Sequence, residues 1–173
     1  MNILSAHMGS SFNELSPLLQ FAHTGMKRYE GSVVVKRGGV IANTICSIFR
    51  FPKASSSSQL VVDCGHFSDR MDWVRDFDGF KMSSSFYSEK NYLVERLGPL
   101  EMQFTAHNVN GALEYQFSKT KLLGIALPKF LWPKVKAYET ESEGQYQFSV
   151  SVHMFLVGFI LSYAGDLKIT EPA

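Results

Sequence analysis

The sequence predicts an all-β, mainly antiparallel fold, closed into a barrel-like, lipocalin-like architecture of the kind that encloses a small molecule. Two observations support this class. Apolar and polar residues alternate in about nine or ten short segments, separated by Gly, Pro, Asn and Asp turn signals every eight to twelve residues or so. Strands do not alternate with long helical patterns, which argues against a doubly wound sheet.

The 173 residues fit one domain. We divide residues 1–173 into an N-terminal helix region, 1–25, and an antiparallel barrel, 28–169. The helix has two possible starts, because Ser11-Phe12-Asn13-Glu14 is a capping-box pattern and Ser16 offers a second N-cap with Pro17 at the first helical position. Leucines and Ala22 then recur at helical spacing, and Gly25 is a plausible end.

The first strands follow this helix. Residues 32–36 are β-branched and run into Gly38-Gly39, so we expect a hairpin in which residues 40–51 form the second strand. The serine run 55–58 is predicted to be a polar loop. Period-two alternation or apolar runs then predict strands near 60–62, 71–77, 92–95, 100–106, 113–117, 146–152 and 159–167.

Two prolines interrupt this pattern, at Pro128 and Pro133, with large apolar residues between them. Proline cannot donate to a sheet ladder, so the segment is predicted to be a short crossover between strands 115–117 and 146–152. It would lay its aromatic side chains, Trp132 among them, across one mouth of the barrel as a plug or lid.

Charge and composition exclude some classes of function. Seventeen basic and sixteen acidic residues give a net charge of +1, and the basic residues are scattered, which argues against nucleic-acid binding. The longest apolar run, 154–161, is too short for a transmembrane segment. No signal peptide is visible, and Cys46 and Cys64 lie in apolar runs, as buried, reduced cysteines do. We therefore expect a cytoplasmic protein.

Sequence motifs for catalysis are absent. The chain has no nucleophile elbow, phosphate loop, dinucleotide fingerprint or zinc-protease motif. The five histidines share none of the short spacings that preorganise a metal site. We expect neither a cofactor nor a metal.

Several segments together resemble the bacterial family known as domain of unknown function 4166. The resemblance rests on LSPLLQFAH, DWVRDFDGFKMSSSFY, LVERLGPLEMQF, NGALEYQF, GIALPKFLWPKVKAYE, GQYQFSVSV and LVGFILSYAGDL. Members occur alone or fused behind saccharopine-dehydrogenase-like reductases, which implies work on small metabolites and, by analogy, an oxidoreductase partner. The chain departs from the family at Phe155, where members often have proline.

Three residues that match family positions are candidate acid or base groups: His23, Glu95 and Glu139. An inward carboxylate with apolar neighbours would act as a general acid or base, whereas an outward one would be an ordinary solvated charge. Glu139 lies in a period-two acidic stripe with Glu141 and Glu143, which favours the solvated alternative. His23 ends the predicted helix, where it could simply satisfy backbone carbonyls.

Candidate ligand contacts are arginines and aromatic residues in or beside strand-like segments: Arg50, Trp73, Arg75, Tyr115, Trp132 and Tyr163. An inward arginine needs a buried carboxylate or an anionic ligand group, but it could instead pack its stem at the rim. Tyrosines could supply hydroxyls to a cavity or lie in the core. The serine run 83–85 could line a wet interior or an exposed edge.

The aromatic content favours a cavity lined by rings, since the chain has 14 Phe, 7 Tyr and 2 Trp. The leading hypothesis is that the barrel binds a small hydrophobic or amphipathic metabolite. The alternative is a cofactor-independent hydrolase, isomerase or cyclase that uses Glu and His for acid-base chemistry. A purely structural partner of an oxidoreductase is the third alternative.

Overall fold

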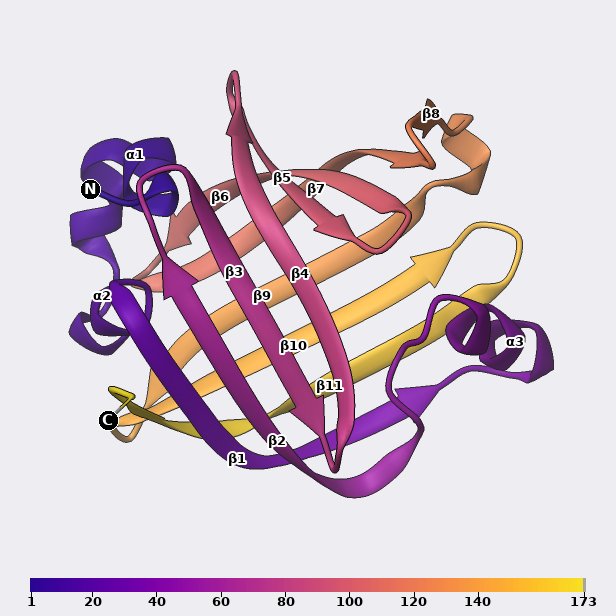
Figure 1. Ribbon diagram of the computed structural model, residues 1–173, viewed down its shortest axis with the longest axis horizontal. Helices are drawn as coiled ribbons and strands as arrows, with labels where there is room; N and C mark the ends of the chain where they lie inside the picture. The colour runs from indigo at the N-terminus through magenta and orange to yellow at the C-terminus, as the bar shows by residue number, and fades with distance from the viewer. Residues whose placement is uncertain (173) are drawn as a thin grey trace.

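Ten antiparallel strands form a closed barrel in the computed structural model, which describes residues 1–172 (Figure 1). Each strand pairs with the next along the chain, and the ring closes where the last strand meets the first. Their bounds are β1 Gly25–Arg37, β2 Ser55–His66, β3 Arg70–Phe77, β4 Phe80–Glu89, β5 Tyr92–Leu97, β6 Leu100–Val109, β7 Ala112–Leu122, β9 Pro133–Ser142, β10 Gln145–Met154 and β11 Gly158–Thr170. The two-residue β8, Ile125–Ala126, adds to the edge of β7. The predicted all-β barrel is confirmed.

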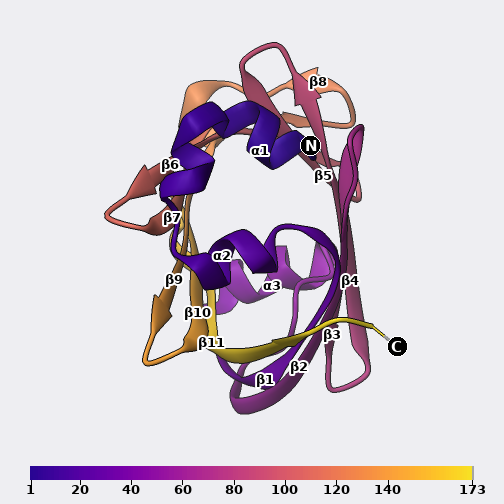
Figure 2. The same cartoon turned by 90° about the vertical axis from the view of Figure 1, so that its left-hand side faces the viewer.

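One end of the barrel carries three short helices, α1 (Ile3–Met8), η1 (Gly9–Glu14) and α2 (Pro17–Ala22). Figure 2 looks onto this end and shows α1 and α2 lying across it. The predicted cap is present, because the Ser16 side chain accepts a hydrogen bond from the Leu19 backbone N–H at 3.3 Å. Leu19 and Ala22 face inward and are fully buried, so α2 seals this end with apolar side chains.

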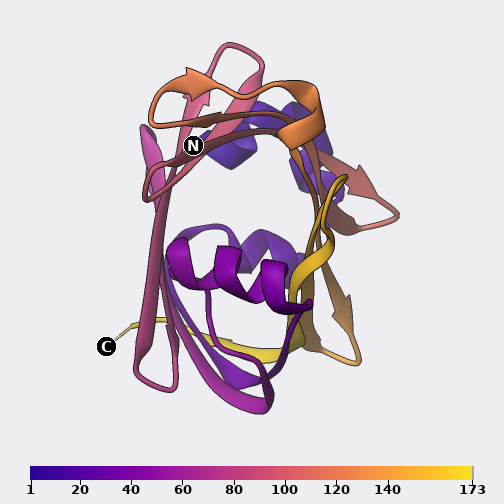
Figure 3. The ribbon, with the colours of Figure 1, turned by 90° about the vertical axis from the view of Figure 1, so that its right-hand side faces the viewer.

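The opposite end carries α3 (Val40–Ile48) and the short η2 (Lys129–Leu131), and Figure 3 shows α3 lying across it. The predicted hairpin strand at 40–51 was wrong. Its β-branched residues suggested a strand, but the inward-facing positions, Ala42, Ile45, Cys46 and Phe49, have the i, i+3, i+4, i+7 spacing of a helix. Strand β1 therefore pairs with β2 and β11 instead.

Two further expectations needed correction. The serines at 55–58 begin β2 instead of forming a loop. The segment after Pro128 does cross at one mouth of the barrel, but it connects β7 to a strand that the prolines concealed, β9, which starts at Pro133. Among residues 1–172, no helix combines the length and the apolar character needed to cross a bilayer.

Candidate functional site

The barrel interior contains two adjoining chambers, which share the side chains of Glu95, Val135, Val150 and Tyr163. The chamber nearer the N-terminal helices has a volume of about 90 Å³, and the chamber nearer α3 about 140 Å³. A site for one water molecule needs about 10–15 Å³ on such a measure, so each chamber has room for several atoms of a bound molecule.

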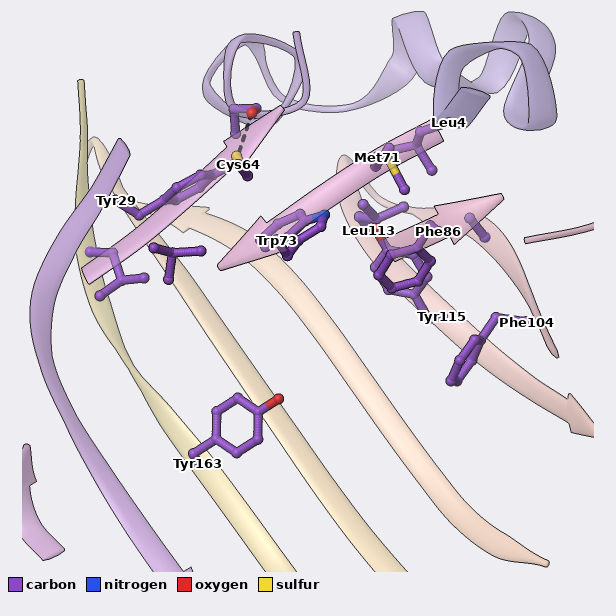
Figure 4. Close-up of a cluster of buried hydrophobic side chains, with 14 of the residues drawn as sticks. Leu4, Tyr29, Cys64, Met71, Trp73, Phe86, Phe104, Leu113, Tyr115 and Tyr163 are labelled. Carbon is purple, nitrogen blue, oxygen red and sulfur yellow. Dashed lines mark hydrogen bonds between the residues drawn. The ribbon is translucent and has the colours of Figure 1, made fainter. Parts of the chain in front are cut away.

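The first, polar chamber is lined by ionisable and hydroxyl-bearing side chains among aromatic rings, chiefly Tyr29, Trp73, Arg75, Glu95, Tyr115, Glu139, Tyr146 and Tyr163. They come from β1, β3, β5, β7, β9, β10 and β11, so strands from around the whole barrel contribute. Figure 4 shows Trp73 between Tyr29 and the Phe86–Tyr115 pair, with Tyr163 further along the interior.

The second, apolar chamber is lined almost entirely by aliphatic, methionine and phenylalanine side chains. Ile45 of α3 and Phe49, the C-cap of that helix, form part of its wall. Leu127 and Leu131 contribute from the connection between β7 and β9, and Pro133 from the start of β9. The interior therefore changes from polar at the α2 end to apolar at the α3 end.

A buried chain of hydrogen bonds supports the polar chamber from behind. The His23 ring lies at the C-cap of α2 and is fully buried. Its Nε2 lies 2.5 Å from Glu139 Oε2, and its Nδ1 lies 3.1 Å from Nε2 of His66. The side-chain amide of Asn2 donates to the His23 carbonyl at 2.7 Å, which fixes the backbone at the same point.

The contact between His66 and the Gly25 carbonyl, at one end of these linked hydrogen bonds, determines which group is the donor in each of them. Nδ1 of His66 faces the carbonyl oxygen of Gly25 at 3.3 Å, and a carbonyl can only accept, so a neutral His66 carries its proton on Nδ1. Its Nε2 then accepts from His23 Nδ1–H. One proton is left for the contact between His23 Nε2 and Glu139. With the proton on Glu139 the pair is a carboxylic acid and a neutral imidazole, and with the proton on His23 it is a carboxylate and an imidazolium. Glu139 is thereby equipped to exchange a proton with a molecule in the chamber.

The pKa of His66 supports this assignment. Burial, with a further contribution from His23, lowers the pKa of His66 to about 3, so the ring is neutral at physiological pH. Burial also raises the pKa of the neighbouring Cys64 thiol to about 12, so that thiol stays protonated.

A second polar group, formed by Arg75, Ser84 and Glu95, lies on the β3–β5 wall. The Arg75 guanidinium donates to Ser84 Oγ at 2.9 Å, lies 3.8 Å from Glu95 Oε1, and is 5.2 Å from the Trp73 ring. Both charged side chains are largely buried, so each offsets the charge of the other. Of the serine run, Ser84 faces inward and Ser83 outward.

The hydroxyl groups of the tyrosines that line the polar chamber stay protonated. Burial raises the pKa of Tyr115 and Tyr146 well above the usual value for tyrosine, and the Glu139 carboxylate raises both further. Burial also raises the pKa of Tyr163. These hydroxyls therefore remain protonated at any physiological pH and can donate to an oxygen of a bound molecule.

The indole N–H of Trp73 has no hydrogen-bond acceptor among residues 1–172, although the side chain is more than nine-tenths buried. A buried polar group without a partner is uncommon and costs about 1–3 kcal/mol. Trp73 lines the polar chamber, but its indole nitrogen is buried from the chamber as well as from solvent, so an acceptor atom of a bound molecule would remove this cost only where neighbouring side chains move to admit it.

The structure brings most of the predicted site residues together. Six line the polar chamber: Trp73, Arg75, Glu95, Tyr115, Glu139 and Tyr163. His23 lies directly behind Glu139. The period-two stripe also exists, but Glu139 points to His23, and Glu141 accepts from the backbone N–H of Leu18 at the start of α2.

Two predicted contacts lie elsewhere. Arg50 is exposed just beyond the C-terminus of α3, because the segment is a helix and strand alternation does not apply to it. Trp132 lies half-buried at the α3 end, where its indole N–H donates to the Leu127 carbonyl at 2.6 Å. Its neighbours Leu131 and Pro133, instead of Trp132 itself, line the apolar chamber.

Sequence reasoning missed His66, Tyr29 and Tyr146. His66 lies 43 positions from His23 along the chain, and only the pairing of β1 with β2 brings the two rings together. Tyr146 could have been found, since it shares period-two spacing with Phe148 and Val150, which also line the chamber. Within residues 1–172, no group of three or more His, Cys, Asp or Glu side chains has the geometry of a metal site.

Comparison with known proteins gives one result. The family model described as Domain of unknown function (DUF4166) matches residues 15–167. The chain belongs to this family. Comparisons with curated proteins and with solved structures gave no match. The DUF4166 match includes the walls of both chambers and the whole His66–His23–Glu139 chain, but its description assigns no activity, so a function must be argued from the geometry.

The burial of His66 predicts how the stability of this DUF4166 protein depends on pH. Its pKa is about 3 in the folded state and about 6.5 in an unfolded chain, so between these values the unfolded state takes up a proton that the folded state does not. Stability is therefore lost as the pH falls through 6.5, by about 2 kcal/mol between pH 7.5 and 5 for this group. Urea denaturation across this range measures the loss.

The matched variants are His66→Gln, which keeps a donor and an acceptor, and His153→Gln at an exposed position. We expect the first to flatten the pH dependence by about 2 kcal/mol and the second to leave it unchanged. Equal pH dependence in both variants would show that His66 titrates normally.

Proposed function

We propose that the barrel binds a small amphipathic molecule, with its polar end at Glu139, Trp73 and Tyr115 and its apolar end towards α3. The observation that carries this proposal is the division of the interior into adjoining polar and apolar chambers with shared walls. A solid core would need neither the ionisable side chains nor the unpartnered Trp73 indole N–H.

The donors in the polar chamber favour a particular polar end. The Trp73 indole, the Arg75 guanidinium and the tyrosine hydroxyls are all groups that can donate hydrogen bonds. Carbonyl or hydroxyl oxygens accept from such donors, and a hydroxyl also offers a proton to the Glu139 carboxylate. We therefore propose an oxygen-bearing head group on an apolar body.

Titration with N-phenyl-1-naphthylamine, whose fluorescence rises in apolar surroundings, tests the proposal. We expect saturable binding at about one probe per chain. Val150→Trp, which fills the boundary between the chambers, should remove this binding, whereas Ser149→Trp on the outer face of the same strand should preserve it. A signal that does not saturate, or that survives Val150→Trp in a folded protein, would contradict the proposal.

A second candidate function is proton-transfer catalysis on such a molecule without a cofactor, as in an isomerase, cyclase or hydrolase. The His66–His23–Glu139 chain favours it, because ligand binding alone does not require a carboxylate backed by two buried imidazoles. The protein would then deplete one compound from a small-molecule cell extract. Glu139→Gln should stop the depletion, and Glu143→Gln in the exposed β9–β10 turn should not.

We also propose a cytoplasmic location. Cys46 and Cys64 are both buried and unpaired, which suits a reducing compartment.

A further inference from the structure

Exposed apolar side chains are concentrated at the α3 end of the barrel. Val40, Ile41 and Ile48 project from the outer side of α3, and Val40 is 86% exposed. Phe155 and Leu156, in the turn between β10 and β11, are also mainly exposed, with Phe155 at 75%.

The connection between β7 and β9 adds three more such residues: Leu123 at 76% exposure, Ile125 and Phe130. We call the exposed apolar residues of α3, of this connection and of the β10–β11 turn the apolar rim. Of the large apolar side chains in residues 1–172 that are more than half exposed, only Met1 lies outside it. Isolated exposed apolar residues are ordinary, but such concentration at one end marks an interaction surface.

Basic residues surround the apolar rim. The segments that carry most of it, residues 31–62 and 115–138, contain nine lysines or arginines and no aspartate or glutamate. Arg50, Lys53, Lys129 and Lys134 are exposed beside the rim.

The carboxylates nearest this end already have partners. Asp78 accepts from Ser58 Oγ and the Gln59 backbone N–H, and Asp76 from the Gly79 backbone N–H. Glu101 pairs with Lys121 and Arg96. Asp76 and Asp78 keep their charge, because their partners are neutral donors, and Glu101 offsets the charge of Lys121. Within residues 1–172, however, Arg50, Lys53, Lys129 and Lys134 form no ion pair, so the exposed charges beside the rim are positive.

We propose that the apolar rim docks on an anionic lipid bilayer. Aliphatic and phenylalanine side chains flanked by lysines are the signature of interfacial membrane binding, in which apolar groups enter the acyl boundary and cations meet anionic headgroups. A protein partner fits less well, since protein interfaces are depleted in lysine.

The rim also lies over the apolar chamber. Ile45 of α3 and its C-cap residue Phe49 line that chamber, while Ile41 and Ile48 of the same helix face solvent. Docking would thus bring the apolar end of the interior next to the bilayer. The docking proposal does not depend on a ligand in the chamber, and the two can be tested separately.

Co-sedimentation with lipid vesicles tests the docking. We expect the protein to sediment with phosphatidylcholine vesicles that contain phosphatidylglycerol, and much less with phosphatidylcholine alone. Ile48→Ser with Phe155→Ser, and separately Lys129→Glu with Lys134→Glu, should each weaken binding roughly tenfold or more.

Matched controls lie away from the rim. Val34→Ser with Val74→Ser, on the outer barrel wall, and Lys90→Glu with Lys168→Glu, near the opposite end, should bind as the unmodified chain does. Rim variants should still bind N-phenyl-1-naphthylamine without vesicles, which separates docking from the cavity. An unmodified chain that stays in the supernatant with anionic vesicles, or rim variants that sediment normally, would overturn the proposal.

Discussion

Replacing His23 with alanine is expected to lower the free energy of unfolding by about 3 kcal/mol. The fully buried ring joins the Glu139 carboxylate to His66, and its removal leaves both without their partner in a low-dielectric interior. For a chain of this length, such a loss corresponds to a fall of about 10 °C in Tm. Thermal and urea denaturation at neutral pH measure it.

Two further variants identify the cause of that loss. Glu139→Gln keeps a hydrogen-bonding group opposite His23 and removes the charge, so we expect a loss of only about 1 kcal/mol. His23→Leu combined with Glu139→Leu leaves no unpaired charge, and this double variant should be more stable than His23→Ala alone. If His23→Ala were no less stable than Glu139→Gln, the chain of hydrogen bonds would contribute little to the fold.

Replacing Gly31 with alanine is expected to be similarly damaging, at about 3 kcal/mol or more. Gly31 lies within β1 and pairs with Leu167 of β11. An added Cβ would lie 2.2 Å from the carbonyl oxygen of Asp166 and 2.8 Å from a methyl group of Leu167. Since the first contact is with backbone, β1 and β11 would have to separate at the seam that closes the barrel.

Gly39→Ala is the matched control. Nothing lies within 4 Å of a Cβ at that position, and its φ of −63° suits any residue. We expect its stability to change by less than about 1 kcal/mol. Comparable losses of stability in both variants would mean that the close approach of β1 and β11 does not exclude a side chain at position 31.

Much of the barrel could be predicted from sequence because period-two alternation directly reports one buried face of a strand. The same rule failed for α3, where Val40, Ile41 and Ile45 have strand propensity but the buried positions follow a helical period. It also failed for β9, since two prolines near its start resembled a simple crossover. Pro133 is tolerated there because it is the first residue of the strand.

The site could be predicted only in part. Alternation places Glu95 and Glu139 on one face of their strands, but it does not say which face is buried. That choice depends on how each strand pairs around the closed ring. The partners of His23 depend on three separate elements, α2, β2 and β9, whose meeting no local pattern encodes. Trp73 could be predicted as an aromatic ligand contact. That its indole N–H has no acceptor depends on how the whole interior packs, which the sequence does not reveal.

The central claim is that the polar chamber receives a ligand. The two tryptophans give two indole N–H signals in a ¹⁵N–¹H spectrum, one from Trp73 inside the chamber and one from Trp132, which is bound to the Leu127 carbonyl outside it. Titration with a medium-chain fatty alcohol, which has a hydroxyl head and an apolar body, should shift the Trp73 signal to saturation and leave Trp132 unmoved. A Trp73 signal that does not respond, or that moves only in parallel with Trp132, would contradict a ligand site inside the barrel.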